Sequence, residues 1–238
     1  MRSTQRFAAA AATAGLVGLL LLSPAAAAQG ASGAAKGSWT LRGFGAWLDT
    51  DEFRFDSRSI DPFPPVIEFT FTVGDGPGAG LALEYRATRR IGVEALAIRA
   101  ELEGEFRLVG FSPSFPEQVV TDDVETDLYG LGLNIHLTPS RRFDVYAGPV
   151  VAYVKYGDFN ATVELGFGTG TFEATFTDDT AYGAVLGADF PLGGSGRWAV
   201  SGALRQLWYD SGNDEEGTIE VGLDPLIATA GVAYRFGG

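Results

Sequence analysis

The side chains that could carry out nucleophilic or acid–base chemistry gather around a single histidine. His136 is the only histidine among 238 residues, and there is no cysteine. Thr138 follows two residues later, and Asp144 follows after a short turn, so this carboxylate could orient the imidazole. No activated serine accompanies them, and a lone histidine on a polar face is more often part of a hydrogen-bond network. We therefore expect no enzymatic activity and keep lipid A modification only as the enzymatic alternative.

A larger set of charged residues recurs on the polar faces of segments in which residue types alternate. Four arginines and four carboxylates share these faces with His136. A balanced set is what an enclosed space of low dielectric constant requires, because an unpaired buried charge costs several kcal/mol. We predict that these residues form a structural polar network in the interior: Arg42, Glu84, Arg86, Glu94, His136, Asp144, Asp189, Arg205 and Arg235.

The segments that must position these side chains alternate with period two. Residues 128–137 show the pattern most clearly, with Leu131, Leu133 and Ile135 on one face and Gly132, Asn134 and His136 on the other. A strand of about ten residues with one continuous apolar face is typical of a transmembrane β-barrel wall. We predict an all-β, eight-stranded, antiparallel up-and-down barrel, with strands at residues 38–49, 79–88, 90–102, 125–138, 142–156, 180–191, 196–210 and 225–236.

The connections between these strands alternate in length. Short turns predicted at the periplasmic side carry arginines, whereas long loops predicted to be extracellular (50–78, 103–124, 157–179 and 211–224) carry most of the acidic residues. Bacterial outer-membrane barrels show this asymmetry. Residues 66–73 and 161–176 alternate as well, the latter as a hairpin turning at 168–170. Ten strands are therefore conceivable, but we interpret these arms as strand extensions above the membrane.

Inward-facing positions toward the outer mouth are apolar. They predict a chamber above the polar network that could bind or pass a small hydrophobic solute, since an eight-stranded barrel is too narrow for a broad aqueous pore. The predicted binding residues are Leu48, Leu96, Ile98, Leu128, Val150, Val154, Leu207 and Ile227. Outward-facing aromatic residues near the strand ends predict two girdles at the membrane interfaces.

The first residues resemble a secretory signal peptide. Arg2 and Arg6 precede an apolar stretch and a small-residue exit at Ala25–Ala28, so we predict cleavage after Ala28. Residues 29–37 would be a short periplasmic segment and 38–238 the barrel domain in the bacterial outer membrane. The net charge of −13 disfavours nucleic acid as a partner. Nothing predicts a metal site or a cofactor.

Both ends of the predicted barrel resemble the outer-membrane protein W (OmpW) family, within the small OmpA-like barrels. The similarity lies in Ser38–Asp49, in Leu223–Pro225 and in Ala230–Phe236, whereas the middle fits any small barrel. It implies an eight-stranded barrel with a narrow, hydrophobic interior that passes small apolar molecules, embedded in lipid and lipopolysaccharide and inserted by the barrel-assembly machinery. One departure is that Gly237 and Gly238 follow the carboxy-terminal aromatic residue.

Two functional hypotheses follow. In the first, the barrel is a conduit or binding cup for small hydrophobic molecules, and Pro149 locally opens the wall because proline removes a ladder hydrogen bond. A simple bulge at Pro149 is the alternative. In the second, the barrel is structural or adhesive and its acidic loops contact other surfaces. The loop carboxylates could also bind divalent cations bridging to lipopolysaccharide, but we favour a solvated surface because a diffuse acidic run lacks the spacing of cation ligands.

Overall fold

The structure is a computed structural model that describes residues 36–50, 53–58, 67–110, 117–138, 143–165, 168–174, 176, 178–209 and 224–237. The predicted signal peptide and nearly all of the segment 29–37 lie outside these residues. No helix in the described part of the chain is long and apolar enough to cross a membrane.

Regular structure in the described residues consists of β-strands. Their bounds are β1 (Trp39–Asp49), β2 (Phe53–Arg58), β3 (Ile67–Val73), β4 (Gly76–Arg86), β5 (Ile91–Gly110), β6 (Gln118–His136), β7 (Asp144–Tyr156), β8 (Phe159–Leu165), β9 (Gly168–Ala174), β10 (Asp179–Leu192), β11 (Trp198–Tyr209) and β12 (Leu226–Phe236).

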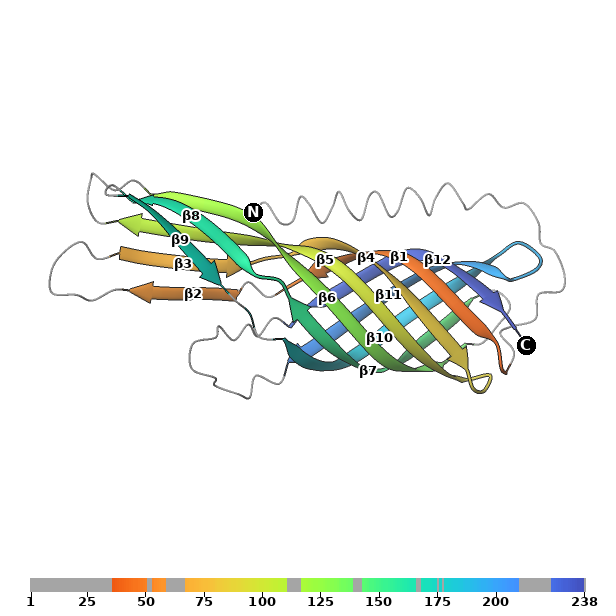
Figure 1. The fold of residues 1–238 in the computed structure, drawn as a ribbon. Coiled ribbons are helices and arrows are strands. Elements are labelled where there is room, and N and C mark those ends of the chain that lie inside the picture. The colour runs from red at the N-terminus through yellow and green to blue at the C-terminus, as the bar shows by residue number, and fades with distance from the viewer. Residues whose placement is uncertain are drawn as a thin grey trace.

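Eight of these strands close into an antiparallel barrel. The order around the wall is β5-β4-β1-β12-β11-β10-β7-β6, and the pairing of β5 with β6 closes it. Chain neighbours pair throughout this ring once the strands outside it are set aside, as in an up-and-down barrel (Figure 1). The predicted fold class is confirmed, and ten spanning strands are excluded because β2, β3, β8 and β9 take no part in the closed ring.

The two faces of the wall separate by residue parity as predicted. Leu131, Leu133 and Ile135 are 59%, 41% and 46% exposed on the outside, whereas their neighbours Asn134 and His136 are buried inside. Aromatic residues lie at both ends of the outer face. Trp39 and Tyr85 pack 4.8 Å apart at the end near the short turns, and Tyr182 and Trp208 pack 6.2 Å apart at the other end. These pairs match the girdles that amphipathic rings form at membrane interfaces.

The prediction of a long loop at residues 103–124 was wrong. β5 runs on to Gly110 and β6 begins at Gln118, so the two strands stay paired from Leu108↔Gln118 down to Ile91↔Ile135. Apolar residues continue on the inner face beyond the predicted strand end, with Leu102, Phe106 and Val124 buried. Burial of this face accounts for the continued ladder, whereas the outward glutamates gave the segment the composition of a loop.

Additional strands lie beyond the barrel wall. Together with the parts of β5 and β6 that continue past Ala100 and Thr126, the strands β2, β3, β8 and β9 are here called the extension. β3 pairs with the far half of β5, β2 pairs with β3, and β8 pairs with β9 in a separate hairpin. Figure 1 shows these strands projecting from one end of the barrel, opposite the end that carries the C-terminus. The prediction of strand extensions is confirmed for β3, but the hairpin turns between Leu165 and Gly168 rather than at 168–170.

Candidate functional site

The barrel interior contains a continuous network of ion pairs centred on Arg42. Its guanidinium group lies 2.8 Å from a Glu84 oxygen, 3.0 Å from Glu94 and 3.0 Å from Asp189. Arg42 is 2% exposed, and each of these carboxylates is 1% exposed or less. A buried guanidinium can be kept charged only by several such contacts, because isolated it would cost several kcal/mol. One residue of β1 therefore ties together β4, β5 and β10.

The other three arginines extend the network around the wall. Arg86 donates to Asp144 at 2.7 Å and to Glu84 at 3.1 Å, Arg235 donates to Asp189 at 3.2 Å, and Arg205 donates to Glu94 at 2.8 Å. The structure thus brings together all nine residues of the predicted polar network: Arg42, Glu84, Arg86, Glu94, His136, Asp144, Asp189, Arg205 and Arg235. Asn134 joins them by donating to Glu84 at 3.2 Å and to Glu94 at 3.3 Å.

His136 is held between two carboxylates. Its Nδ1 lies 3.0 Å from Asp144 and its Nε2 lies 2.9 Å from Glu84, so both ring nitrogens are engaged. The hydroxyl of Thr138 accepts a hydrogen bond from the Val145 backbone N–H at 3.0 Å, within the turn. Neither group is available to activate the other. The histidine therefore has the contacts of a network member, and these residues form no nucleophile–base pair.

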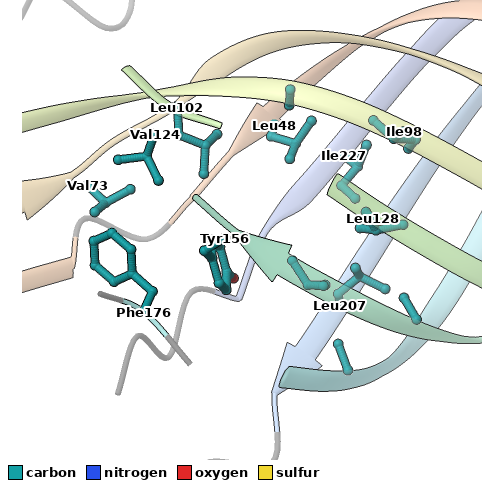
Figure 2. Close-up of a cluster of buried hydrophobic side chains, with 14 of the residues drawn as sticks. Leu48, Val73, Ile98, Leu102, Val124, Leu128, Tyr156, Phe176, Leu207 and Ile227 are labelled. Atoms are coloured by element: carbon teal, nitrogen blue, oxygen red, sulfur yellow. The ribbon is translucent and has the colours of Figure 1, made fainter. Parts of the chain in front are cut away.

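Above the network lie the eight residues predicted to line an apolar chamber, here called the apolar column: Leu48, Leu96, Ile98, Leu128, Val150, Val154, Leu207 and Ile227. All eight side chains are 5% exposed or less and belong to one hydrophobic cluster. Figure 2 shows several of them facing one another from strands around the wall, and the same cluster continuing into the extension. The structure therefore places side chains of these residues in contact as a packed core.

Four aromatic residues, from β3, the end of β7, the start of β8 and position 176, cover the outer end of the apolar column. The ring of Phe71 lies 4.8 Å from Phe159 and 5.7 Å from Phe176, and Tyr156 packs at 6.1 Å against Phe176. We call Phe71, Tyr156, Phe159 and Phe176 the aromatic cap. The Tyr156 hydroxyl also donates to that of Tyr209, 2.9 Å away. These residues were not predicted as part of a site. For Phe71, alternation over residues 66–73 was the available signal.

The wall has one interruption beside Pro149. β6 and β7 pair from Thr126↔Tyr156 to Gly132↔Val150, and pairing resumes only at Ile135↔Ala147. The ladder is thus interrupted where Leu133 faces Pro149 and Asn134 faces Gly148. Since proline has no N–H to donate, a local gap in the ladder is its expected consequence. The interruption lies between Val150 of the apolar column and Asn134 of the network.

The outer face of the extension is acidic. Glu101 lies opposite Glu125, and Glu103 lies opposite Asp123, in the ladder between β5 and β6. Arg99 contacts Glu125 at 2.9 Å and Asp127 at 3.4 Å, on a largely exposed surface. Within the described residues, no group of three or more His, Cys, Asp or Glu side chains is arranged to hold a metal ion.

Comparison with known proteins agrees with this geometry. A family model described as the outer membrane protein beta-barrel domain matches residues 13–236. The chain belongs to this family. Its members are outer-membrane barrels, so the described fold spans the bacterial outer membrane, with the short turns on the periplasmic side and the extension outside.

Solved structures show the same fold at low sequence identity. The outer membrane protein OprG from Pseudomonas aeruginosa is 19% identical, with a TM-score of 0.59 over 88% of this chain and 100% of that chain. The outer membrane protein AlkL is 17% identical, with a TM-score of 0.50 over 89% of this chain and 94% of that chain. No curated protein sequence matches the chain. The resemblance to small OmpW-like barrels is thus confirmed at the level of the fold.

Proposed function

We propose that this barrel is a narrow conduit or binding cup for small hydrophobic molecules. One observation supports this most directly, namely that the apolar column and the aromatic cap form one continuous hydrophobic cluster. This cluster leads from the extension into the barrel wall, as Figure 2 shows. An apolar solute that replaced these contacts one by one would remain in an apolar environment and would avoid the polar outer surface.

The ion network disfavours passage of such a solute through the lower lumen and therefore favours lateral exit. Its charged groups fill the lumen below the apolar column, and an apolar molecule would lose favourable contacts by entering among them. The interruption of the wall at Pro149 lies at the boundary between these two regions. We therefore propose that the solute leaves through the β6–β7 seam into the lipid, where a ladder bond is already missing.

The conduit is tested by a matched pair of substitutions on β6. Leu128→Trp places an indole inside the apolar column, whereas Leu131→Trp places the same group on the lipid face, where Leu131 is 59% exposed. Vesicles with lipopolysaccharide in the outer leaflet and albumin inside would report uptake of radiolabelled decane. We expect Leu128→Trp to lower the initial rate to that of protein-free vesicles and Leu131→Trp to leave it unchanged. Equal rates in both variants would refute the conduit.

The lateral exit is tested by Pro149→Val in the same vesicles. Valine can donate the missing hydrogen bond and close the seam, so we expect slower uptake. Pro191→Val is the matched control, because Pro191 keeps its ladder partner Ala199 on β11. Uptake by Pro149→Val at the wild-type rate would refute lateral exit while leaving the conduit intact.

An adhesive or structural role is the second candidate, and the acidic face of the extension favours it. Glu101, Glu103, Asp123 and Glu125 face outward on strands that project beyond the membrane, so a basic partner surface would be complementary. Replacing all four by Gln or Asn leaves the inward apolar face untouched. Unchanged binding of the variant to cationic surfaces, at low and at high salt, would count against this role.

A further inference from the structure

Arg205 belongs to both the apolar and the charged part of the lumen. It lies on β11 opposite Val185 and Ile227, at the level of the apolar column, and it is 2% exposed. Its terminal nitrogens reach Glu94 at 2.8 Å and the Thr229 hydroxyl at 3.3 Å, and its Cζ lies 5.9 Å from the centre of the Phe44 ring. Its Nε, however, has no hydrogen-bond partner.

An unpartnered, buried N–H is costly, and here it is part of a charged group. Leaving such a donor unsatisfied destabilises the folded protein, and more so when the group is ionised. A partner with an acceptor oxygen would remove this cost. The position of Arg205 among column residues means that the partner could approach along the apolar column, whereas Arg42 is surrounded by carboxylates.

The charge of the network favours an anionic partner. Each of the two His136 contacts joins a ring nitrogen to a carboxylate oxygen, at 3.0 Å and 2.9 Å, and each needs a hydrogen between its two atoms. A neutral imidazole supplies one of these two hydrogens, so the second is an additional proton. It adds one positive charge to a set in which four guanidinium groups balance four carboxylates, whichever group holds the proton. With both hydrogens present, the charged side chains buried in the described lumen would sum to one positive unit. A single negative charge would neutralise it.

We propose that Arg205 binds the carboxylate of an amphipathic ligand, an unbranched apolar chain with a terminal carboxylate, whose chain lies along the apolar column. This inference rests on the proposed function, because the chain must enter the same column. The carboxylate accepts from the free Nε–H and neutralises the network. An alcohol of equal length can accept the same hydrogen bond without neutralising the charge, and an alkane can do neither. The affinity order is carboxylate, then alcohol, then alkane.

The test compares decanoate, decanol and decane as ligands of the full-length barrel in nanodiscs of neutral lipid, with binding measured by calorimetry. Decanoate adds a negative charge to the hydrogen bond that decanol can also accept, so it should bind about tenfold tighter than decanol. Arg205→Met keeps an unbranched side chain of similar reach but removes the charge and the donor. It should weaken decanoate binding about tenfold, weaken decanol binding by a smaller factor, and leave decane binding unchanged. Arg99→Met, on the exposed outer surface, should change none of the three.

The outcomes separate this inference from the proposed function. Equal affinity for decanoate and decanol, or equal loss of both in Arg205→Met, would overturn carboxylate recognition and leave the conduit standing. Binding of none of the three ligands would overturn both. Should Arg205→Met fail to fold, as judged by heat-modifiable gel mobility, Arg205→Lys serves instead. Lysine keeps the charge but lacks the Nε–H and the planar fork, so decanoate and decanol should both bind more weakly while decanoate remains the tighter ligand; unchanged affinity for both would refute the proposal.

Discussion

His136 on β6 and Glu84 on β4 meet at 2.9 Å although β5 lies between their strands in the wall. The contact is possible because the intervening inward position on β5 is Gly92, which pairs with both neighbouring strands. A Cβ at Gly92 would lie 2.8 Å from the Glu84 Cδ and 2.9 Å from its Cγ. The absent side chain thus provides the space through which Glu84 reaches across the lumen.

Gly92→Ala should therefore destabilise the barrel. The added methyl group must displace the Glu84 carboxylate and lengthen its bond to His136, and overpacking of this kind costs about 1–3 kcal/mol. The measurement is the free energy of unfolding in urea after refolding into lipid vesicles. Gly45→Ala is the matched control, since a Cβ at Gly45 meets nothing within 4 Å and faces the lipid. Equal stability of the two variants would show that Glu84 can relax without loss.

Glu84→Gln tests the network at its most connected carboxylate. Glu84 accepts from Arg42, Arg86, His136 and Asn134, and it is fully buried. Removing its charge leaves buried cations uncompensated, so we expect a loss of about 3–5 kcal/mol in the free energy of unfolding.

The control for Glu84→Gln is Glu125→Gln on the outer face of the extension. Glu125 pairs with Arg99 at 2.9 Å, but both side chains are about two-thirds exposed. Exposed pairs contribute roughly 0–1 kcal/mol, so this variant should unfold almost as the wild type does. A small effect of both substitutions would mean that the interior network is hydrated and exchangeable rather than a structural element.

The inward and outward faces of the wall were predictable from the sequence because the pleat imposes them. Once Leu131, Leu133 and Ile135 face the lipid, Asn134 and His136 must face the lumen. The partners of these residues were not predictable. Whether His136 meets Asp144 alone or also Glu84 depends on the stagger between β4, β5 and β6, which no single strand's alternation specifies.

The extension was only partly predictable, for a different physical reason. Residues 102–108 alternate as regularly as the membrane strands do, with Leu102, Phe106 and Leu108 buried on one face. Their outward neighbours are Glu103, Glu105 and Arg107, which suit water rather than lipid, so composition suggested a loop. The aromatic cap depends on contacts among β3, β7, the start of β8 and Phe176, and period-two patterning carries no information about such contacts.

Phe71→Ala should loosen the extension while leaving the barrel closed. Phe71 is fully buried between Phe159 and Phe176, and removing a buried phenyl ring typically costs about 3–5 kcal/mol. Because β3 pairs only with β2 and β5 within the described residues, the loss should remain local. Hydrogen exchange should accelerate in β3 and in β5 beyond Leu102, but not in β10 or β11. Val119→Ala, at a position 48% exposed, is the control. Faster exchange throughout the wall would contradict a separable extension.

Tyr209→Phe should alter the alkaline behaviour of the aromatic cap. Tyr209 lies next to Trp208 of the outer girdle, at the extracellular end of β11, and burial raises its pKa from 10.0 to about 12. Burial also raises the pKa of Tyr156, its hydroxyl partner at 2.9 Å. A raised pKa of an acid means that folding stabilises the protonated form, so this stabilisation is complete below pH 10 and is lost as the pH rises to about 12.

Absorbance of tyrosinate at alkaline pH should therefore show late-titrating tyrosines in the wild type and one fewer in Tyr209→Phe. An unchanged number of late-titrating tyrosines in Tyr209→Phe would show that the hydroxyl pair is open to water.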